Sequence, residues 1–134
     1  MLCHVSLKLV NLINNKISDD GVCKLVLGSP RLEWIGLGEC NNITDRSLEH
    51  IAANAKNLKG IDLHVGIAIA QPVSDRLYIG TNGLEQLLGL PRLGRIALST
   101  EMEVLRHTIE TQRPDIEMFN QWEFSRQFME LCND

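Results

Sequence analysis

The chain repeats a short pattern of apolar residues, and this repetition constrains its fold more than any other feature. Each copy opens with L-x-x-[LIV]-x-L, and the first leucines of successive copies are Leu7, Leu32, Leu58 and Leu93. The steps between them are 25, 26 and 35 residues, so the third copy contains an insertion. A period of this length indicates a stacked solenoid, in which each unit packs on its neighbours.

Each unit is predicted to contain a short strand and then a helix. The last two apolar residues of the opening alternate with a polar or small residue, as in a strand with one buried face. A turn carrying Asn15 or Cys40 follows, and Ile-Ser/Thr-Asp then predicts a helix start with a short polar cap. Apolar residues at helical spacing come next: Val22, Leu25 and Val26; Leu48, Ile51, Ala52 and Ala55; Leu84, Leu87 and Leu88.

This pattern resembles the leucine-rich repeat family, in its cysteine-containing and ribonuclease-inhibitor-like subtypes with a helix in every repeat. The resemblance is clearest from Leu32 to Ile51 and extends over roughly two thirds of the chain. It implies an α/β fold: a short right-handed solenoid with parallel strands on the concave face, helices on the convex face and a C-terminal helical cap. One such opening would be weak evidence, but three in phase favour the fold strongly.

The period predicts one domain, residues 1–134, with an interrupted third repeat and an atypical end. The expected repeats are 7–31, 32–57, 58–92 and 93–114, followed by a cap at 115–134. The insert at 65–77 alternates apolar and small residues, which predicts an ordered hairpin or flap, and a plain surface excursion is the alternative. Four of the six aromatic residues lie in the cap, which closes the core. A possible second contact with a partner involves Ile67, Ile69, Trp122 and Met129.

At the other end, the first repeat begins at Leu7 and no capping segment is predicted before it. An open apolar edge of a stack predicts an upstream domain, a partner subunit or a dimer. In the F-box relatives an F-box would precede the repeats, and residues 1–6 are too short for one. The resemblance to ubiquitin-ligase adaptors therefore concerns their repeat region alone.

Strand side chains between the core positions are expected to point to the concave face. In four successive units these positions hold Leu9, Asn11 and Ile13; Trp34, Gly36 and Gly38; Gly60, Asp62 and His64; Arg95, Ala97 and Ser99. We expect Trp34 to be an exposed anchor for a partner, because Trp and Arg lead interface hot spots. The alternative is that Trp34 lies flat over neighbouring glycines and covers them. The predicted partner-binding residues are Leu9, Asn11, Ile13, Trp34, Asp62, His64 and Arg95.

These residues and their spacing favour neither catalysis nor metal binding. Asp62, His64 and Ser99 have the residue types of a nucleophilic set, but an open strand surface would not exclude water, and no glycine-rich loop entering a helix offers an oxyanion site. Cys3 and His4 are adjacent, and the chain has no C-x-x-C or H-x-x-x-H pair. We therefore predict a protein that is not an enzyme and has no cofactor or metal.

The amino-acid composition limits which classes of partner and which cellular compartment are expected. The 13 basic and 17 acidic residues give a net charge of −4 without a basic block, so nucleic acid is not the predicted partner. No apolar run approaches the ~20 residues of a membrane span. The cysteines are scattered and residues 1–5 lack the pattern of a secretory signal, which predicts a reducing location, cytoplasmic or nuclear, with an organelle left open.

The family resemblance implies an interaction scaffold, since proteins similar to this one are mostly of that kind. The concave face around Trp34 would then bind a protein partner, as in the substrate-recognition modules of F-box ubiquitin-ligase adaptors. The alternative is a structural accessory subunit of a larger assembly, such as an organellar complex. That subunit would dock through the open N-terminal edge, the insert and the aromatic C-terminal tail.

Overall fold

The computed structural model describes residues 7–64, 81–98 and 103–120, together with Glu123, Arg126, Gln127, Met129 and Glu130. Within these ranges, five strands form one parallel sheet in chain order, and the helices α1 to α4 alternate with them. The strands are β1 (Leu9–Asn11), β2 (Trp34–Gly36), β3 (Gly60–Asp62), β4 (Arg95–Ala97) and β5 (Glu117–Phe119). The helices are α1 (Asp19–Leu27), α2 (Asp45–Asn54), α3 (Thr81–Leu87) and α4 (Glu103–Gln112).

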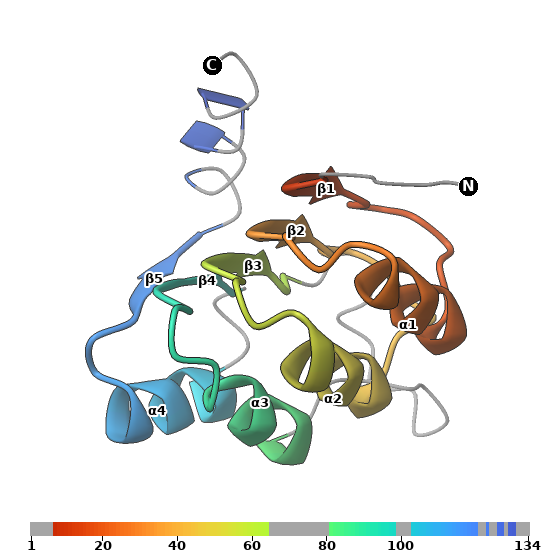
Figure 1. The fold of residues 1–134 in the computed structure, drawn as a ribbon. Helices are drawn as coiled ribbons and strands as arrows, with labels where there is room; N and C mark the ends of the chain where they lie inside the picture. The colour runs from red at the N-terminus through yellow and green to blue at the C-terminus, as the bar shows by residue number, and fades with distance from the viewer. Residues whose placement is uncertain are drawn as a thin grey trace.

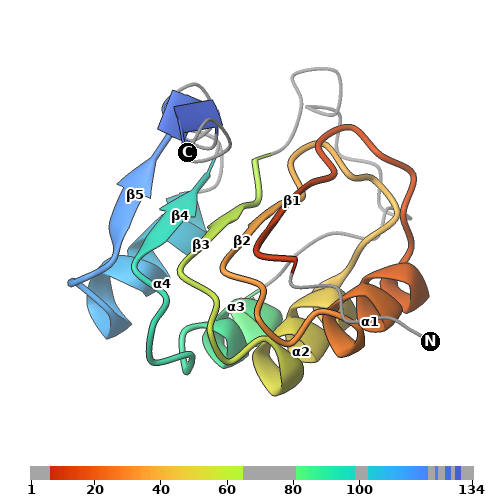
Figure 2. The same cartoon turned by 45° about the horizontal axis from the view of Figure 1, so that its top comes forward.

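The strands form one layer and the helices form the other (Figure 1). The view in Figure 2 shows the same order, with neighbouring units side by side from the β1–α1 end to the β5–α4 end. The α/β leucine-rich-repeat-like solenoid predicted from the sequence is therefore confirmed. We call the face of the sheet that points away from the helices the concave face.

Register across the sheet is uninterrupted and places equivalent residues of each unit in columns. The central column holds Val10, Ile35, Ile61, Ile96 and Met118. Buried leucines precede β2, β3 and β4 at the same offset, and Leu32, Leu58 and Leu93 are at most 1% exposed, whereas Leu7 before β1 is half-buried. Ile116 takes this place before β5 and is 4% exposed, so the strand expected in the C-terminal cap continues the stack as a fifth opening.

The main core lies between the sheet and the helices and is built from the repeated apolar positions. Its largest fully buried side chains are Leu32, Ile35, Leu37, Leu48, Ile51, Leu58, Ile61, Leu63, Leu84, Leu87 and Leu90. Because each unit covers the edge of the next, this core is continuous along the stack.

The predicted helix starts are capped as the local sequence indicates. The Ser18 hydroxyl accepts the Gly21 backbone N–H at 3.2 Å before α1. The Thr44 hydroxyl accepts the Arg46 N–H at 3.1 Å before α2. These bonds satisfy backbone donors that have no partner inside the helix.

A carboxylate in the first turn of α1 also caps the next helix. Asp19 accepts the Thr44 N–H at 2.8 Å, the Thr44 hydroxyl at 2.7 Å and the Ser47 hydroxyl at 2.5 Å. Burial on its own would raise the pKa of Asp19, but the hydrogen bonds from Ser47 and Thr44 outweigh it and lower the pKa below its usual 3.8. Asp45 is the equivalent residue of α2, and its carboxylate lies next to α3. A Cβ added to Gly83 of α3 would lie 2.6 Å from Asp45 Oδ1.

Cys40 occupies the bend after β2, as the sequence predicted for a small side chain. It is 8% exposed, and its thiol donates to the Leu12 carbonyl of the preceding unit at 2.9 Å. Burial raises the pKa of the Cys40 thiol, and the charges of Asp62 and Glu39 act in the same direction. The group therefore stays a protonated thiol and serves as a donor between units.

At the N-terminal end of the stack, β1 is the edge strand of the sheet. Its apolar neighbours Val10, Leu12, Ile17 and Leu25 pack against the main core but are only partly buried. Residues 1–6, which precede this strand, lie outside the described residues, so the open edge stays a prediction. Among the described residues, no helix is long and apolar enough to cross a membrane.

The substitution Asp19→Ala should lower the free energy of unfolding by about 2 kcal/mol, because three donors of α2 lose a charged acceptor. Urea denaturation at neutral pH measures the change. Asp20→Ala is the matched control, since Asp20 is exposed in the same helical turn and should cost less than about 0.5 kcal/mol. Equal losses in the two variants would show that the link between the helices contributes nothing.

Candidate partner-binding face

Two rows of side chains cross the concave face in register. The first row holds Leu9, Trp34, Gly60, Arg95 and Glu117. The second row holds Asn11, Gly36, Asp62, Ala97 and Phe119. The predicted alignment of the first four strands is therefore confirmed. The sequence-based grid ended at the fourth strand and so missed Glu117 and Phe119.

Trp34 is 9% exposed, so the expectation of a solvent-exposed anchor is wrong. It forms a second apolar cluster with Ala97, against which Leu9 and Phe119 pack, separate from the main core. A Cβ added to Gly60 would overlap the Trp34 ring, because the ring lies over that glycine on the next strand. The alternative interpretation, a tryptophan that covers a glycine, matches this geometry.

Arg95 connects this cluster to the C-terminal segment. Its guanidinium carbon lies 5.8 Å from the Trp34 ring centroid and 5.6 Å from that of Phe119. Such contacts are favourable because each aromatic face is electronegative. One guanidinium nitrogen, Nη1, also donates to Oε1 of Gln127 at 2.6 Å. The two rings and this bond fix the position of the guanidinium on the concave face.

A groove of about 640 Å³ opens beside this cluster. It is lined by Trp34, Lys59, Arg92, Gly94, Arg95, Asp115 and Glu117. These residues lie at the starts of the strands or just before them, so β2 to β5 all contribute to its walls. The groove combines an aromatic wall with charges of both signs, which is the composition of many protein-binding surfaces.

The charged groups around the groove differ in how they are bonded. Lys59 lies 3.5 Å from the Glu33 carboxylate on the surface. Arg92 donates to the Asn57 side-chain oxygen at 3.0 Å. Asp115 accepts two bonds from Arg113, from Nε at 3.0 Å and from Nη2 at 2.9 Å. Arg92 therefore has a neutral partner, whereas Asp115 is neutralised within the protein.

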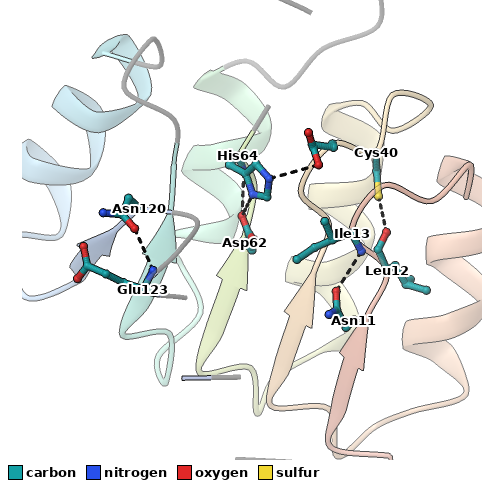
Figure 3. A network of polar contacts seen from close by, with 9 residues as sticks. Asn11, Leu12, Ile13, Cys40, Asp62, His64, Asn120 and Glu123 are labelled. Carbon is teal, nitrogen blue, oxygen red and sulfur yellow. Dashed lines mark hydrogen bonds and ion pairs between the residues drawn. The ribbon is translucent and has the colours of Figure 1, made fainter. Parts of the chain in front are cut away.

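Asp62 and His64 are buried on the concave face, at 0% and 4% exposure, so the expected open polar groups are not there. His64 Nδ1 lies 2.6 Å from Asp62 Oδ1, and the His64 backbone N–H donates to the same oxygen at 3.0 Å (Figure 3). The other Asp62 oxygen is buried without a hydrogen-bond partner in the described part of the chain. The expected exposure of Asp62 and His64 is therefore wrong, whereas their contribution to partner binding stays a prediction.

Glu39 completes the surroundings of His64. Its carboxylate lies 3.8 Å from His64 Nε2, and its backbone has a positive φ of 58°. The imidazole rests on Gly38, where an added Cβ would overlap the ring. Burial on its own would lower the pKa of His64, but its bond to Asp62 and the charges of Asp62 and Glu39 raise the pKa above its usual 6.5.

The remaining predicted residues are at the edges of this face. Asn11 is exposed, and its side-chain oxygen accepts the Ile13 N–H at 3.1 Å, which is the same local turn that Asp62 forms with His64 (Figure 3). Leu9 and Ile13 are half-buried. Met129 is 66% exposed. Ser99, Ile67, Ile69 and Trp122 and the insert 65–77 lie outside the described residues.

Sequence reasoning missed several groups that shape the site: Glu39, Lys59, Arg92, Glu117, Phe119 and Gln127. Extending the two rows to a fifth strand would have found Glu117 and Phe119. The others come from loops and from the C-terminal segment, where the repeat carries no positional signal. Within the described residues, no group of three His, Cys, Asp or Glu side chains could hold a metal ion.

No protein-family profile and no curated protein sequence matches this chain. Among solved structures, it is similar to the tropomodulin C-terminal domain from Caenorhabditis elegans, with 14% sequence identity and a TM-score of 0.44. The match covers 98% of this chain and 92% of that chain. The fold assignment rests on the strand order, register and core of the chain itself.

The substitution Gly60→Ala should displace the Trp34 ring and lower the free energy of unfolding by about 1–3 kcal/mol, because the added methyl group has no free space. Gly94→Ala is the control, since the nearest atom to its added Cβ is the Arg92 carbonyl oxygen at 4.0 Å. Urea denaturation compares the two variants. A Gly60→Ala variant as stable as the control would contradict the placement of Trp34 over this glycine.

The raised pKa of His64 predicts a pH dependence of stability. The folded state holds a proton that the unfolded state releases, so the contribution is complete below about pH 6.5 and is lost as the pH rises through the folded pKa. Urea denaturation should show that the wild type is less stable at about pH 8.5 than at about pH 6, because the contribution of the His64 proton is lost as the pH rises. The variant His64→Gln should lose this dependence, whereas His107→Gln, at an exposed position in α4, should retain it.

Proposed function

We propose that this chain is a non-catalytic protein-interaction module that binds a protein partner through the groove beside Trp34 and Arg95. The observation that carries the proposal is the guanidinium of Arg95, which is held between two aromatic rings at the wall of an open, charged groove. Rigid aromatic and arginine side chains are enriched at the energetic centres of protein interfaces. A partner would meet a surface that is already ordered.

In this proposal Trp34 is a wall of the site and not its protruding anchor. Its indole is largely covered, so it contributes by fixing Arg95 and by lining the groove. Leu9, half-buried at the near end of the first row, extends the apolar part of the surface. Asp62 and His64 would stabilise the concave face without contacting the partner, because both side chains are buried.

The finer form of the proposal is substrate recognition, as in the repeat regions of F-box adaptors. The bound segment would then belong to a protein that is marked by ubiquitin. The resemblance described from the sequence supports this form. The groove itself supports only the binding of a protein segment.

A second function is supported by the other end of the stack. The partly buried Val10, Leu12, Ile17 and Leu25 leave apolar surface at the edge strand β1. A structural accessory subunit of a larger assembly would cover this edge with a neighbouring protein, and an exposed sheet edge is a ready template for pairing. In this second function the groove would contribute less to partner binding than the β1 edge.

Charge reversal at the groove separates the two functions. The double variant Lys59→Glu/Arg92→Glu changes two exposed lining residues. The matched control Lys24→Glu/Arg46→Glu makes the same change in charge on exposed helix positions of α1 and α2. We expect the groove variant to reduce partner capture about tenfold relative to the control, a difference of about 1.4 kcal/mol. Affinity purification with mass spectrometry from the native cell measures it.

Substitution at the edge strand gives the opposite pattern if the accessory-subunit function is correct. Ile13→Asp places a charge beside β1 at a half-buried position. Loss of capture in this variant, with normal capture by the groove variant, would overturn the groove proposal. Circular dichroism of each purified variant establishes that the fold is retained.

A further inference from the structure

We propose that the groove accepts an acidic peptide segment, and that one carboxylate of this segment replaces the side-chain oxygen of Gln127 on Arg95. This inference rests on the proposed function and names the chemistry of the partner. Its support comes from the charges that line the groove and from the neutral hydrogen-bond partners of Arg92 and Arg95.

The balance of charge in the groove is positive. Its lining includes three cations, Lys59, Arg92 and Arg95, and two carboxylates, Asp115 and Glu117. Asp115 is already bonded to Arg113 through two nitrogens, and Lys59 is likewise paired with Glu33 at 3.5 Å. The remaining charges of the lining are those of Arg92, Arg95 and Glu117, which leave an excess of one positive charge. The whole chain has a net charge of −4, so the groove differs in sign from the protein around it. Such a local field attracts an anionic group to this position.

The two arginines of the groove donate to amide oxygens. Arg92 Nη1 bonds to Asn57 Oδ1 at 3.0 Å, and Arg95 Nη1 bonds to Gln127 Oε1 at 2.6 Å. In the described part of the chain, neither guanidinium has an ion pair within 4.0 Å. A hydrogen bond to a carboxylate is roughly twice as strong as one to a neutral oxygen. A carboxylate from a partner would therefore be preferred at either arginine.

Gln127 marks the position that such a carboxylate would take. A glutamine side chain has the shape of glutamate, and its Oε1 stands where a carboxylate oxygen would bond to Arg95. Trp34 and Phe119 hold the guanidinium in place from their ring faces, so no rearrangement of Arg95 is needed. A bidentate carboxylate would use two parallel N–H donors, whereas the recorded bond uses one.

Gln127 lies in the segment that follows β5, and this segment begins where Asn120 accepts the Glu123 N–H at 2.9 Å (Figure 3). The described residues of this segment are helical, and none of them belongs to the main core between the sheet and the helices α1 to α4. Replacement of the single bond from Arg95 to Gln127 therefore removes no described contact of the main core.

A nucleic acid is the less suitable anion. Phosphate polymers are bound through many Lys and Arg contacts spread along the strand, and their affinity depends on that number. Three cations beside two carboxylates, in a chain of net charge −4, suit a short acidic peptide better. An oligonucleotide is accordingly one arm of the test.

Fluorescence polarisation with labelled peptides tests the inference on the full chain. The probes are octaglutamate, octaglutamine as its neutral counterpart, and an eight-residue oligothymidylate. We expect octaglutamate to bind and octaglutamine not to bind. Raising the salt from about 0.05 M to about 0.5 M should weaken octaglutamate binding several-fold, because ion pairs are screened.

The variant Gln127→Glu supplies an internal carboxylate to Arg95 and should weaken octaglutamate binding at least fivefold. Gln127→Ala removes the internal competitor and should strengthen it. Glu130→Gln, at an exposed position in the same segment, is the control and should leave binding within twofold. Arg95→Gln should abolish binding, and its circular dichroism spectrum shows whether the fold is kept.

Three results would each overturn the inference. Octaglutamate could fail to bind at about 1 mM, the affinity of a weak contact, or Gln127→Glu could bind it as well as Gln127→Ala does. The third is that oligothymidylate binds more tightly than octaglutamate and its affinity changes in the same way across the Gln127 and Arg95 variants. If octaglutamate does not bind while capture of cellular protein still depends on Lys59 and Arg92, only the acidic partner is wrong. If capture is also insensitive to these residues, the proposed function fails too.

Discussion

Everything in this protein depends on the alignment of one apolar column from unit to unit. Ile35, Ile61 and Ile96 pair in register at the centre of the sheet, and the leucines that precede these three strands are buried in the main core. No unit has enough apolar surface to fold alone, so the free energy of folding comes from the contacts between units. The shape of the concave face follows, because the same register sets its rows.

Much of this could be predicted from the sequence because it is local or periodic. The leucine spacing gives the strands, and Ser18 and Thr44 give the helix starts, since both signals act within a few residues. The burial of Trp34, Asp62 and His64 could not be predicted in this way. It depends on groups from other units: Phe119 packs against the Trp34 cluster from the fifth strand, and the His64 ring lies against Gly38 and near Glu39. A repeat pattern places a side chain on a face but does not say what covers it.

The concave face consequently combines two kinds of environment on one sheet. On the first row, aromatic rings and Arg95 form a second apolar cluster beside an open groove. On the second row, a buried carboxylate and an imidazole balance each other's charge. Pairing offsets part of the cost of burying the two groups, and the second Asp62 oxygen has no hydrogen-bond partner in the described part of the chain. The row that borders the groove and the row that holds the buried pair are two residues apart along the strands.

The bonds that Asp19 accepts from Thr44 and Ser47 connect the helices of the first two units. Cys40 adds a second connection, because its thiol donates to the Leu12 carbonyl. A bond between two units is lost when either unit loses its order, and the coupling free energy is the same in both directions. The first two units are therefore expected to melt together and not one after the other.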